Sequence, residues 1–263
     1  MRQVFKAFAM VLGVSFGCSL VVTSAAVLLK ERQERNLRLD KIEHLLELAQ
    51  IPSGEDPLSA YQTHIEPWLI DLAQARPVDP SQVGIDDLAA FSIASAARDP
   101  GLSQPIPKER DLAAIKRRPR YMPVYFVKGE QGFTRLILPI YGRGLWSTLY
   151  GYLALESDLT TIAGITFYEH RETPGLGGEV DNPRWKALWR GKLAFDAQGQ
   201  VAIEVIKGTV DLNRPEAIHQ VDGLSGATLT TRGVDRLVRY WLGPDGYGPF
   251  LEQLRRQTAE HAA

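Results

Sequence analysis

Asp222-Gly-Leu-Ser-Gly-Ala-Thr228-Leu-Thr230 is the stretch around which the rest of this chain is organised. Its small, glycine-containing residues let the backbone turn sharply and let a partner approach closely, and Thr228 offers that partner a hydroxyl. Directly behind it, Thr230–Leu242 carries apolar residues at i, i+3, i+4 and i+7, which predicts an amphipathic helix. These apolar residues are Val234, Leu237, Val238 and Trp241. A hydroxyl-rich turn that leads into a helix N-terminus is a place where a phosphate can bind. By spacing alone, an ordinary capping turn is the simpler interpretation.

Three other stretches carry residue types that suit a bound cofactor. Gly144-Leu145-Trp146-Ser147 is a turn between two expected strands, with a stacking face and a hydroxyl. Glu172-Thr173-Pro174-Gly175-Leu176-Gly177 places a rigid proline before glycines, so its backbone amides can face a ligand. Lys207 follows an expected strand and can neutralise a phosphate. Each has an ordinary alternative: a glycine turn with a packed tryptophan, a surface loop in which His170 has no role, and a solvated lysine.

Taken in their order along the chain, these three stretches and Asp222–Thr230 resemble a family of proteins that carry FMN covalently. The family includes the C subunit of the Na⁺-translocating NADH:quinone reductase and the related G subunit of the Rnf complex. Asp222-x-x-Ser225-Gly-Ala-Thr228 is similar to its flavinylation motif, and Ile115-Lys-Arg-Arg118 also fits. The closing stretch from Trp241 to Phe250 resembles the reductase protein more than the Rnf protein. The resemblance covers residues 108–256 and the N-terminal anchor; residues 50–107 match poorly, and Arg214–Gln220 is more loosely related.

The resemblance implies one FMN per chain, bound through a phosphoester to Thr228 and added by a separate periplasmic flavin transferase that uses FAD. Asp222 would serve transferase recognition. A threonine hydroxyl is a poor nucleophile without an activating base, and no Ser-His-Asp arrangement lies nearby, so a separate enzyme is chemically reasonable. Trp146 and Leu176 would pack near the flavin ring, with Glu172 and Thr173 at its polar edge. The full set of implied FMN contacts is Gly144, Leu145, Trp146, Ser147, Glu172, Thr173, Gly175, Leu176, Gly177, Lys207, Ser225, Gly226, Ala227 and Thr230.

Composition excludes several other functions. The 263 residues carry a formal net charge of -1, which gives no reason to expect nucleic acid as a partner. Cys18 is the one cysteine, so there is no internal disulfide, and the five histidines lack metal-ligand spacing. We therefore predict no metal site. No catalytic acid, catalytic base or dinucleotide-binding GxGxxG motif is apparent, so the chain is expected to act only as part of an enzyme complex.

An uncharged apolar run, Ala7–Leu29, is long enough to cross a bilayer. Ser24-Ala-Ala26 resembles a signal-peptidase site, but the run is longer than a typical signal-peptide core, so we expect a retained anchor in membrane lipid. Arg2 and Lys6 precede the run, whereas five basic residues follow it: Lys30, Arg32, Arg35, Arg38 and Lys41. The positive-inside rule would then place the large domain in the cytoplasm. The resemblance implies the opposite, a periplasmic domain anchored in the bacterial inner membrane, and we follow it.

The order of expected strands and helices predicts an α+β fold, in which one N-terminal transmembrane helix precedes a soluble domain with an antiparallel sheet and packed helices. The resemblance implies that this soluble domain binds FMN. The expected segments are 1–6, the span 7–29, a helical and irregular part 30–107, the FMN-binding domain 108–256 and a frayed tail 257–263. Expected strands are Pro123–Val127, Arg135–Ile140, Leu149–Leu155, Ile162–Tyr168 and Val201–Ile206. Expected further helices are Lys30–Gln50, Ile85–Ala97, Pro183–Trp189 and Pro249–Arg255. The basic cluster Lys116–Arg120 is expected to be solvated surface or, alternatively, to face an acidic partner.

The expected function is a membrane-anchored electron carrier. Together with other subunits that handle NADH, quinone and sodium, it would pass electrons from NADH to ubiquinone, coupled to sodium export. Two alternatives stay open: the Rnf-type electron-transport protein, and a membrane-tethered binding or assembly domain without redox chemistry.

Overall fold

The structure is a computed structural model that describes residues 2–52, 54–85, 87–88, 91–130 and 132–262, with side chains as far as Thr258. It divides into two compact units, Met1–Lys41 and Ile42–Ala263.

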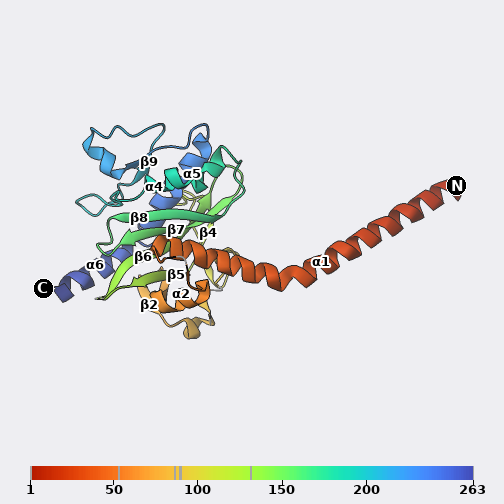
Figure 1. Cartoon of the computed structure of the whole chain (residues 1–263), viewed down its shortest axis with the longest axis horizontal. Helices are drawn as coiled ribbons and strands as arrows, with labels where there is room; N and C mark the ends of the chain where they lie inside the picture. The colour runs from red at the N-terminus through yellow and green to blue at the C-terminus, as the bar shows by residue number, and fades with distance from the viewer. Residues whose placement is uncertain (1, 53, 86, 89–90, 131, 263) are drawn as a thin grey trace. The chain divides into compact units, whose positions relative to one another are not determined.

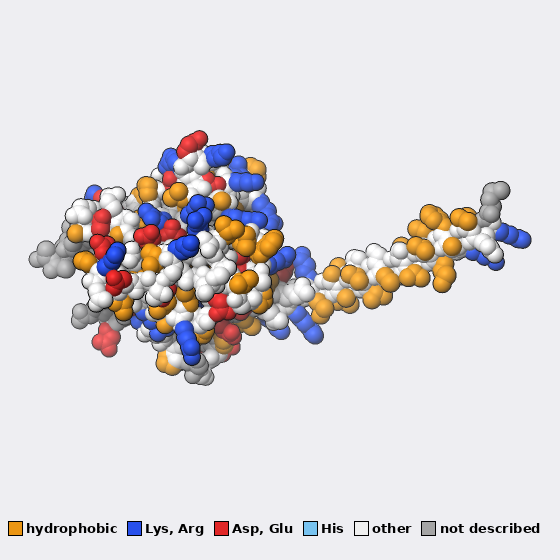
Figure 2. Space-filling model, turned by 90° about the horizontal axis from the view of Figure 1, so that it is seen from above, with side chains coloured by type: hydrophobic (Ala, Val, Ile, Leu, Met, Phe, Trp, Pro, Cys, Tyr) orange, Lys and Arg blue, Asp and Glu red, His pale blue; other side chains and the backbone are white. Residues whose placement is uncertain are grey.

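Helix α1 (Arg2–Ala49) is one uninterrupted helix of 48 residues. In the part of the chain that the structure describes, it is the one helix long and apolar enough to cross a membrane. Its side chains are mostly hydrophobic, with Lys and Arg at both ends of the apolar part (Figure 2). The helix expected over Lys30–Gln50 is therefore a continuation of the anchor. Leu37 in this continuation is 56% exposed, and the buried residues of α1 begin at Ile42.

The large unit is built on a six-stranded sheet in the order β2-β1-β5-β6-β7-β8 (Figure 1). Every neighbouring pair of strands is antiparallel. The strands are β1 (Ile65–Asp71), β2 (Arg76–Val78), β5 (Tyr121–Lys128), β6 (Phe133–Arg143), β7 (Thr148–Glu156) and β8 (Ile162–Glu169). The predicted α+β fold with an antiparallel sheet is confirmed, and the first four expected strands are β5 to β8.

Besides the sheet and α1, the described elements are α2 (Pro57–His64), η1 (Pro80–Val83), α3 (Ile93–Arg98), β3 (Ser103–Pro105), β4 (Arg117–Pro119), η3 (Gly177–Asp181), α4 (Pro183–Ala187), β9 (Glu204–Val205), η4 (Pro215–His219), β10 (Gln220–Val221), α5 (Thr228–Leu242) and α6 (Gly248–Ala262). Most are short, whereas α5 and α6 have 15 residues each.

Several sequence expectations differ from these elements. The strand expected over Val201–Ile206 is only Glu204–Val205, because this segment pairs with two-residue β10 outside the main sheet. Of the helix expected over Ile85–Ala97, α3 covers the part from Ile93 on, and residues 86 and 89–90 lie outside the described residues. The expected frayed tail instead continues α6 as far as Ala262.

The basic cluster Lys116–Arg120 is bound largely within the protein. Arg117 donates to Ser103, Arg118 donates to the carbonyl oxygen of Asp245, and Arg120 pairs with the buried Asp71 at 2.9 Å. These contacts fix the ends of β4 and β5 and leave fewer charges for an acidic partner.

Each face of the sheet has its own hydrophobic core. One face is covered by the last turns of α1 and by α2, with Ile42, Leu45 and Tyr61 among the buried residues. The other face is covered by α5 and the segments around it, with Trp189 and Trp241 among the largest fully buried side chains. Because side chains alternate across a strand, one sheet supports both layers.

Helix α5 lies against β6. A Cβ atom on Gly233 would stand 2.5 Å from the carbonyl oxygen of Arg143, so only glycine permits this approach. Near the other end of the helix, the Trp241 indole donates to the carbonyl oxygen of Tyr141 at 2.7 Å. This packing carries the first residue of α5, Thr228, toward the turn between β6 and β7.

Candidate functional site

The buried carboxylate of Glu172 joins three segments that are distant in the sequence. Its Oε1 accepts hydrogen bonds from the backbone N–H groups of Trp146 (2.9 Å) and Ser147 (3.2 Å). Its Oε2 accepts from the Leu145 N–H (3.2 Å) and from the Thr230 hydroxyl (2.6 Å). With four donors, the carboxylate has its lone-pair positions filled. Glu172 therefore fastens the β6–β7 turn to the first turn of α5.

Two glycines make room for this carboxylate. A Cβ atom on Gly144 would lie 2.6 Å from Glu172 Oε1, and one on Gly177 would lie 2.5 Å from the Thr230 hydroxyl oxygen. From sequence we expected these glycines to admit the cofactor and Glu172 to bond to it. In the structure the glycines leave room for the hydrogen-bonded side chains of Glu172 and Thr230, and the carboxylate of Glu172 accepts its hydrogen bonds from groups of the protein itself.

The pKa of Glu172 is lowered. Burial is the largest single contribution and acts to raise the pKa, since Glu172 is only 5% exposed. The hydrogen bonds from the Thr230 hydroxyl and the three amides together outweigh it. The side chain is thus an anion at neutral pH, held by neutral donors rather than by a basic residue.

His170, for which we expected no role, supports the same loop. Its Nδ1 accepts from the Glu172 N–H at 3.2 Å, and its Nε2 lies 2.8 Å from Asp181. The bond to Asp181 is the main reason why the pKa of His170 is raised. No signal in the sequence revealed this contact, because Asp181 belongs to a separate 3₁₀ turn.

The loop before Thr228 is tied down from several sides. The Trp185 indole donates to the carbonyl oxygen of Asp222 (2.8 Å), and the Asp222 carboxylate accepts from the Val210 N–H (2.8 Å). The Thr231 hydroxyl accepts from the Leu224 N–H at 3.0 Å. These contacts hold the turn that presents Thr228, and none of Trp185, Val210 and Thr231 was singled out from the sequence.

Thr228 is exposed at the start of α5, and Ser225 and Gly226 beside it are exposed as well. The residue before it, Ala227, gives the helix no side-chain cap. The first N–H groups of a helix have no partner within it, so this terminus offers free donors and a positive dipole end to an anion.

Apolar side chains surround this terminus. Trp146 is 65% exposed and Leu176 is 44% exposed, and Leu145 and Leu229 are exposed too. Leu176 lies directly beside loop 222–227, which precedes Thr228, since a Cβ atom on Gly226 would be 3.1 Å from its Cδ2. Large apolar side chains grouped around a polar anchor point are typical of a ligand site.

The structure thus brings together most of the residues singled out from the sequence. The β6–β7 turn, the Glu172–Gly177 loop and the start of α5 meet through the bonds of Glu172. Thr173 is exposed and closes its loop through its carbonyl oxygen, which accepts from Leu176 and Gly178. Lys207 is exposed in a segment joined to loop 222–227 by the hydrogen bond from the Gly223 N–H to the carbonyl oxygen of Gly208 (2.9 Å).

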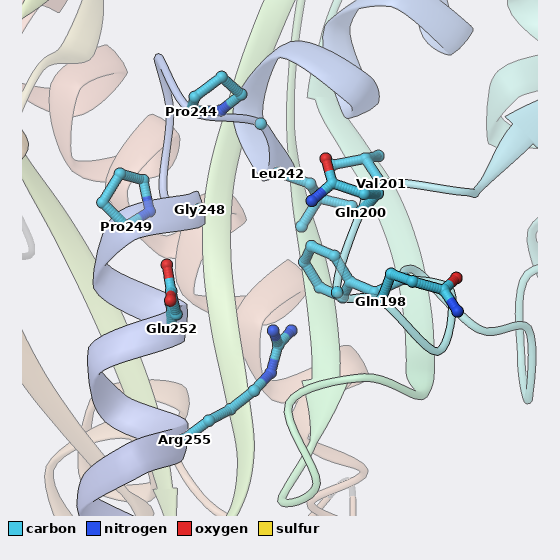
Figure 3. A pocket seen from close by; sticks show the side chains of 12 residues that line it. Gln198, Gln200, Val201, Leu242, Pro244, Gly248, Pro249, Glu252 and Arg255 are labelled. Atoms are coloured by element: carbon cyan, nitrogen blue, oxygen red, sulfur yellow. The ribbon is translucent and has the colours of Figure 1, made fainter.

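A separate cavity of about 320 Å³ lies at the opposite end of α5 (Figure 3). It is lined by the turn after Leu242, by the Gln198–Val201 segment and by Glu252 and Arg255 of α6. From Thr228 to Leu242 the helix is about 20 Å long at 1.5 Å per residue. None of the residues expected to contact FMN lines this cavity.

A scan against protein families matches the FMN-binding domain over residues 144–243, a range that holds the β6–β7 turn, the Glu172–Gly177 loop and loop 222–227 before Thr228. The sequence is 49% identical to the C subunit of the Na⁺-translocating NADH-quinone reductase of Pseudomonas aeruginosa, over 92% of each chain. It is 43% identical to the same protein of Vibrio vulnificus, over 95% of each chain.

Two solved structures are also similar to this chain. The crystal structure of Shewanella oneidensis NqrC matches with a TM-score of 0.75 at 36% identity, covering 84% of this chain and 99% of that one. The crystal structure of the corresponding protein from Parabacteroides distasonis matches with a TM-score of 0.64 at 27% identity, covering 85% and 96%. The resemblance inferred from the sequence is confirmed: this chain belongs to the C-subunit family of the Na⁺-translocating NADH-quinone reductase, an oxidoreductase complex, and it contains the family's FMN-binding domain.

Proposed function

We propose that this protein carries one FMN bound covalently to Thr228 and relays electrons within the sodium-pumping complex, from NADH toward ubiquinone. The observation that supports it most is the exposed Thr228 hydroxyl at an uncapped helix terminus, beside exposed Trp146 and Leu176. A phosphate attached there meets free N–H donors, and a planar ring finds apolar surface within reach. These features fit FMN, which supplies the redox chemistry when bound.

Attachment is a phosphoryl transfer in which Thr228 is the acceptor. The Thr228 hydroxyl oxygen bonds to the FMN-side phosphorus of FAD, the bond between the two phosphates breaks, AMP leaves, and the hydroxyl proton passes to the medium. Among the described residues, no hydrogen bond joins the Thr228 hydroxyl to a side chain that could act as a base, which supports a separate transferase as the source of activation. A tether through the phosphate retains the carrier and raises its effective concentration near its redox partners.

The test is intact-mass spectrometry with peptide mapping on the full chain from membranes that contain an active flavin transferase. We expect the Thr228 peptide to carry the mass of FMN less one water. Thr228→Val should fold like the parent and carry none. Covalent flavin on that variant would contradict the assignment. An unmodified parent, beside a modified control substrate, would favour the membrane-tethered domain without redox chemistry.

Asp222 in the motif allows a sharper test of transferase recognition. Its Oδ1 accepts from the Val210 N–H, and an asparagine Oδ1 can accept the same bond. Asp222→Asn should therefore keep the loop and the stability of the parent while removing the charge. If the carboxylate is recognised, this variant is modified much more slowly than the parent. Equal rates for parent and Asp222→Asn, with loss only in Asp222→Ala, would make Asp222 a purely structural residue.

We further propose that α1 is a retained single-pass anchor and that the large domain faces the periplasm of the inner membrane. Cys18 is the one cysteine of the chain, so Cys18→Ser gives a clean background for labelling. In that background, Gln198→Cys on an exposed loop should react with a membrane-impermeant maleimide in intact cells. Reaction only after the inner membrane is opened would place the domain in the cytoplasm, as the count of basic residues alone suggests.

A further inference from the structure

Arg232 lies one helical turn after Thr228, on the same exposed face of α5. Residues at i and i+4 of a helix have Cβ atoms about 5–6 Å apart. Helical side chains also lean toward the N-terminus, so a long side chain covers the turn before its own Cα atom. The guanidinium of Arg232 therefore has the reach and the direction to meet a group attached to the Thr228 oxygen.

This guanidinium is not committed to another charge. Within the described residues no carboxylate lies within ion-pair distance of Arg232, whereas Arg110 and Arg120 pair with Asp245 and Asp71. The neighbouring side chains on α5 offer no donor for a phosphate. Leu229 is apolar and exposed, and the Thr230 and Thr231 hydroxyls make hydrogen bonds inside the protein. An exposed arginine without a partner, next to an anion acceptor site, is available to bind a phosphate.

We propose that Arg232 is a phosphate-binding residue for the flavin attached to Thr228. The inference rests on the proposed covalent attachment and adds a side-chain partner for the phosphodiester. The planar guanidinium donates two parallel hydrogen bonds to phosphate oxygens, while the N–H groups at the start of α5 face the same anion. Arg232 and the helix terminus together fix the phosphate, and the Trp146–Leu176 surface is left for the ring.

Arg236 supplies a matched control. It is also exposed, lies on the same face of α5 and likewise makes no ion pair among the described residues. It is one turn farther from Thr228, about 12 Å along the axis at 1.5 Å per residue. Arg232→Gln and Arg236→Gln therefore remove the same charge from the same helix face, but only the first removes a donor within reach of the phosphate.

The experiment compares parent, Arg232→Gln, Arg232→Lys and Arg236→Gln as full chains in detergent, each with and without flavin. Intact mass gives the modified fraction, and ³¹P NMR gives the phosphodiester resonance in the modified samples. We expect Arg232→Gln to shift that resonance while Arg236→Gln leaves it at the parent position. Arg232→Lys should give an intermediate shift, since lysine keeps the positive charge but lacks the two parallel N–H donors of the guanidinium. The rise in Tm on flavinylation should also be smaller for Arg232→Gln than for the other three.

The outcomes separate this inference from the function on which it rests. A parent that remains unmodified beside an active transferase removes the covalent attachment, and the Arg232 inference with it. A modified parent whose resonance and Tm gain are the same in Arg232→Gln and Arg236→Gln overturns the Arg232 inference alone. Variants without flavin should have equal Tm values, because the proposed contact needs the phosphate; a deficit of Arg232→Gln there would assign it a structural role instead.

Discussion

Glu172 makes more hydrogen bonds in the candidate site than any other side chain described above. Its four donors come from Leu145, Trp146, Ser147 and Thr230. Glu172→Gln keeps the shape of the side chain but replaces one carboxylate oxygen with an NH₂ group. The two donors on that oxygen lose their acceptor, and the other two donors keep an acceptor that is no longer charged. We expect a loss of about 2–3 kcal/mol in the free energy of unfolding, measured by urea denaturation. Glu169→Gln, at an exposed neighbour, is the control and should be near neutral.

The pH dependence of this effect has a definite sign. Since the folded-state pKa of Glu172 is lowered from 4.5, its contribution is fully present above 4.5 and is lost as the pH falls through the folded value. The difference in unfolding free energy between parent and Glu172→Gln should thus be present at neutral pH and shrink in acid as Glu172 is protonated. His170 titrates as well, and because the charge of Glu172 adds to its raised pKa, protonation of His170 enlarges the difference at higher pH, before the loss in acid begins. A difference that grows in acid would show that Glu172 is protonated in the folded protein.

The sequence singled out the residues of the candidate site, but not their bonding. Thr228, Trp146 and Leu176 were chosen because the stretches that hold them resemble the FMN-carrying family, and the structure exposes all three. The role of Glu172 depends on partners 25 to 58 positions away. Only the approach of α5 to β6 brings those partners together, and no local pattern reports such a contact.

At the scale of elements, the packing of α5 on β6 determines where Thr228 stands. Gly233→Ala should raise helix propensity by about 1 kcal/mol, yet its Cβ would meet the Arg143 carbonyl oxygen at 2.5 Å. We expect the clash to win, with a net loss of roughly 1–2 kcal/mol and slower flavinylation, because the helix must move away from the β6–β7 turn. Thermal unfolding and a time course of intact mass measure the two effects.

Gly17→Ala makes the same substitution in α1, where nothing lies within 4 Å of the added Cβ. It should leave both the stability of the domain and the rate of flavinylation unchanged. If Gly233→Ala behaves in the same way, then the contact between α5 and β6 tolerates a methyl group and does not position Thr228.

The sheet shows which elements a sequence can reveal. Strands β5 to β8 are almost continuously apolar because both faces are covered, and they were predicted. Strand β1 was missed because Glu66 and Pro67 interrupt its pattern. Its register explains how the proline is tolerated: β2 pairs only with Leu69–Asp71, so Pro67 has a strand on one side alone.

For the whole molecule, the end of α1 belongs to the large unit as much as to the anchor. Ile42, Leu45 and Leu48 are buried in the second core, and Glu47 pairs with Lys186 at 2.9 Å. The pKa of Glu47 is lowered to about 2, mainly by its neighbour His44 and then by Lys186, against the effect of burial. The boundary of the folded domain therefore lies before Ile42, whereas the FMN-binding domain expected from the sequence begins only at residue 108.

Two truncations test this boundary. A chain that begins at Asn36 lacks the apolar run but keeps Ile42–Ala49, whereas one that begins at Pro52 loses both. Each buried aliphatic side chain contributes about 1.5–3 kcal/mol, so removing these last turns exposes the Tyr125 and Tyr152 face of the sheet at a cost comparable with the whole stability of a domain. We expect the Asn36 chain to be monomeric in size-exclusion chromatography, with a cooperative thermal transition. The Pro52 chain should aggregate or unfold at much lower temperature. If both chains have the same Tm, the last turns of α1 serve only as a spacer between the anchor and a domain that is already complete without them.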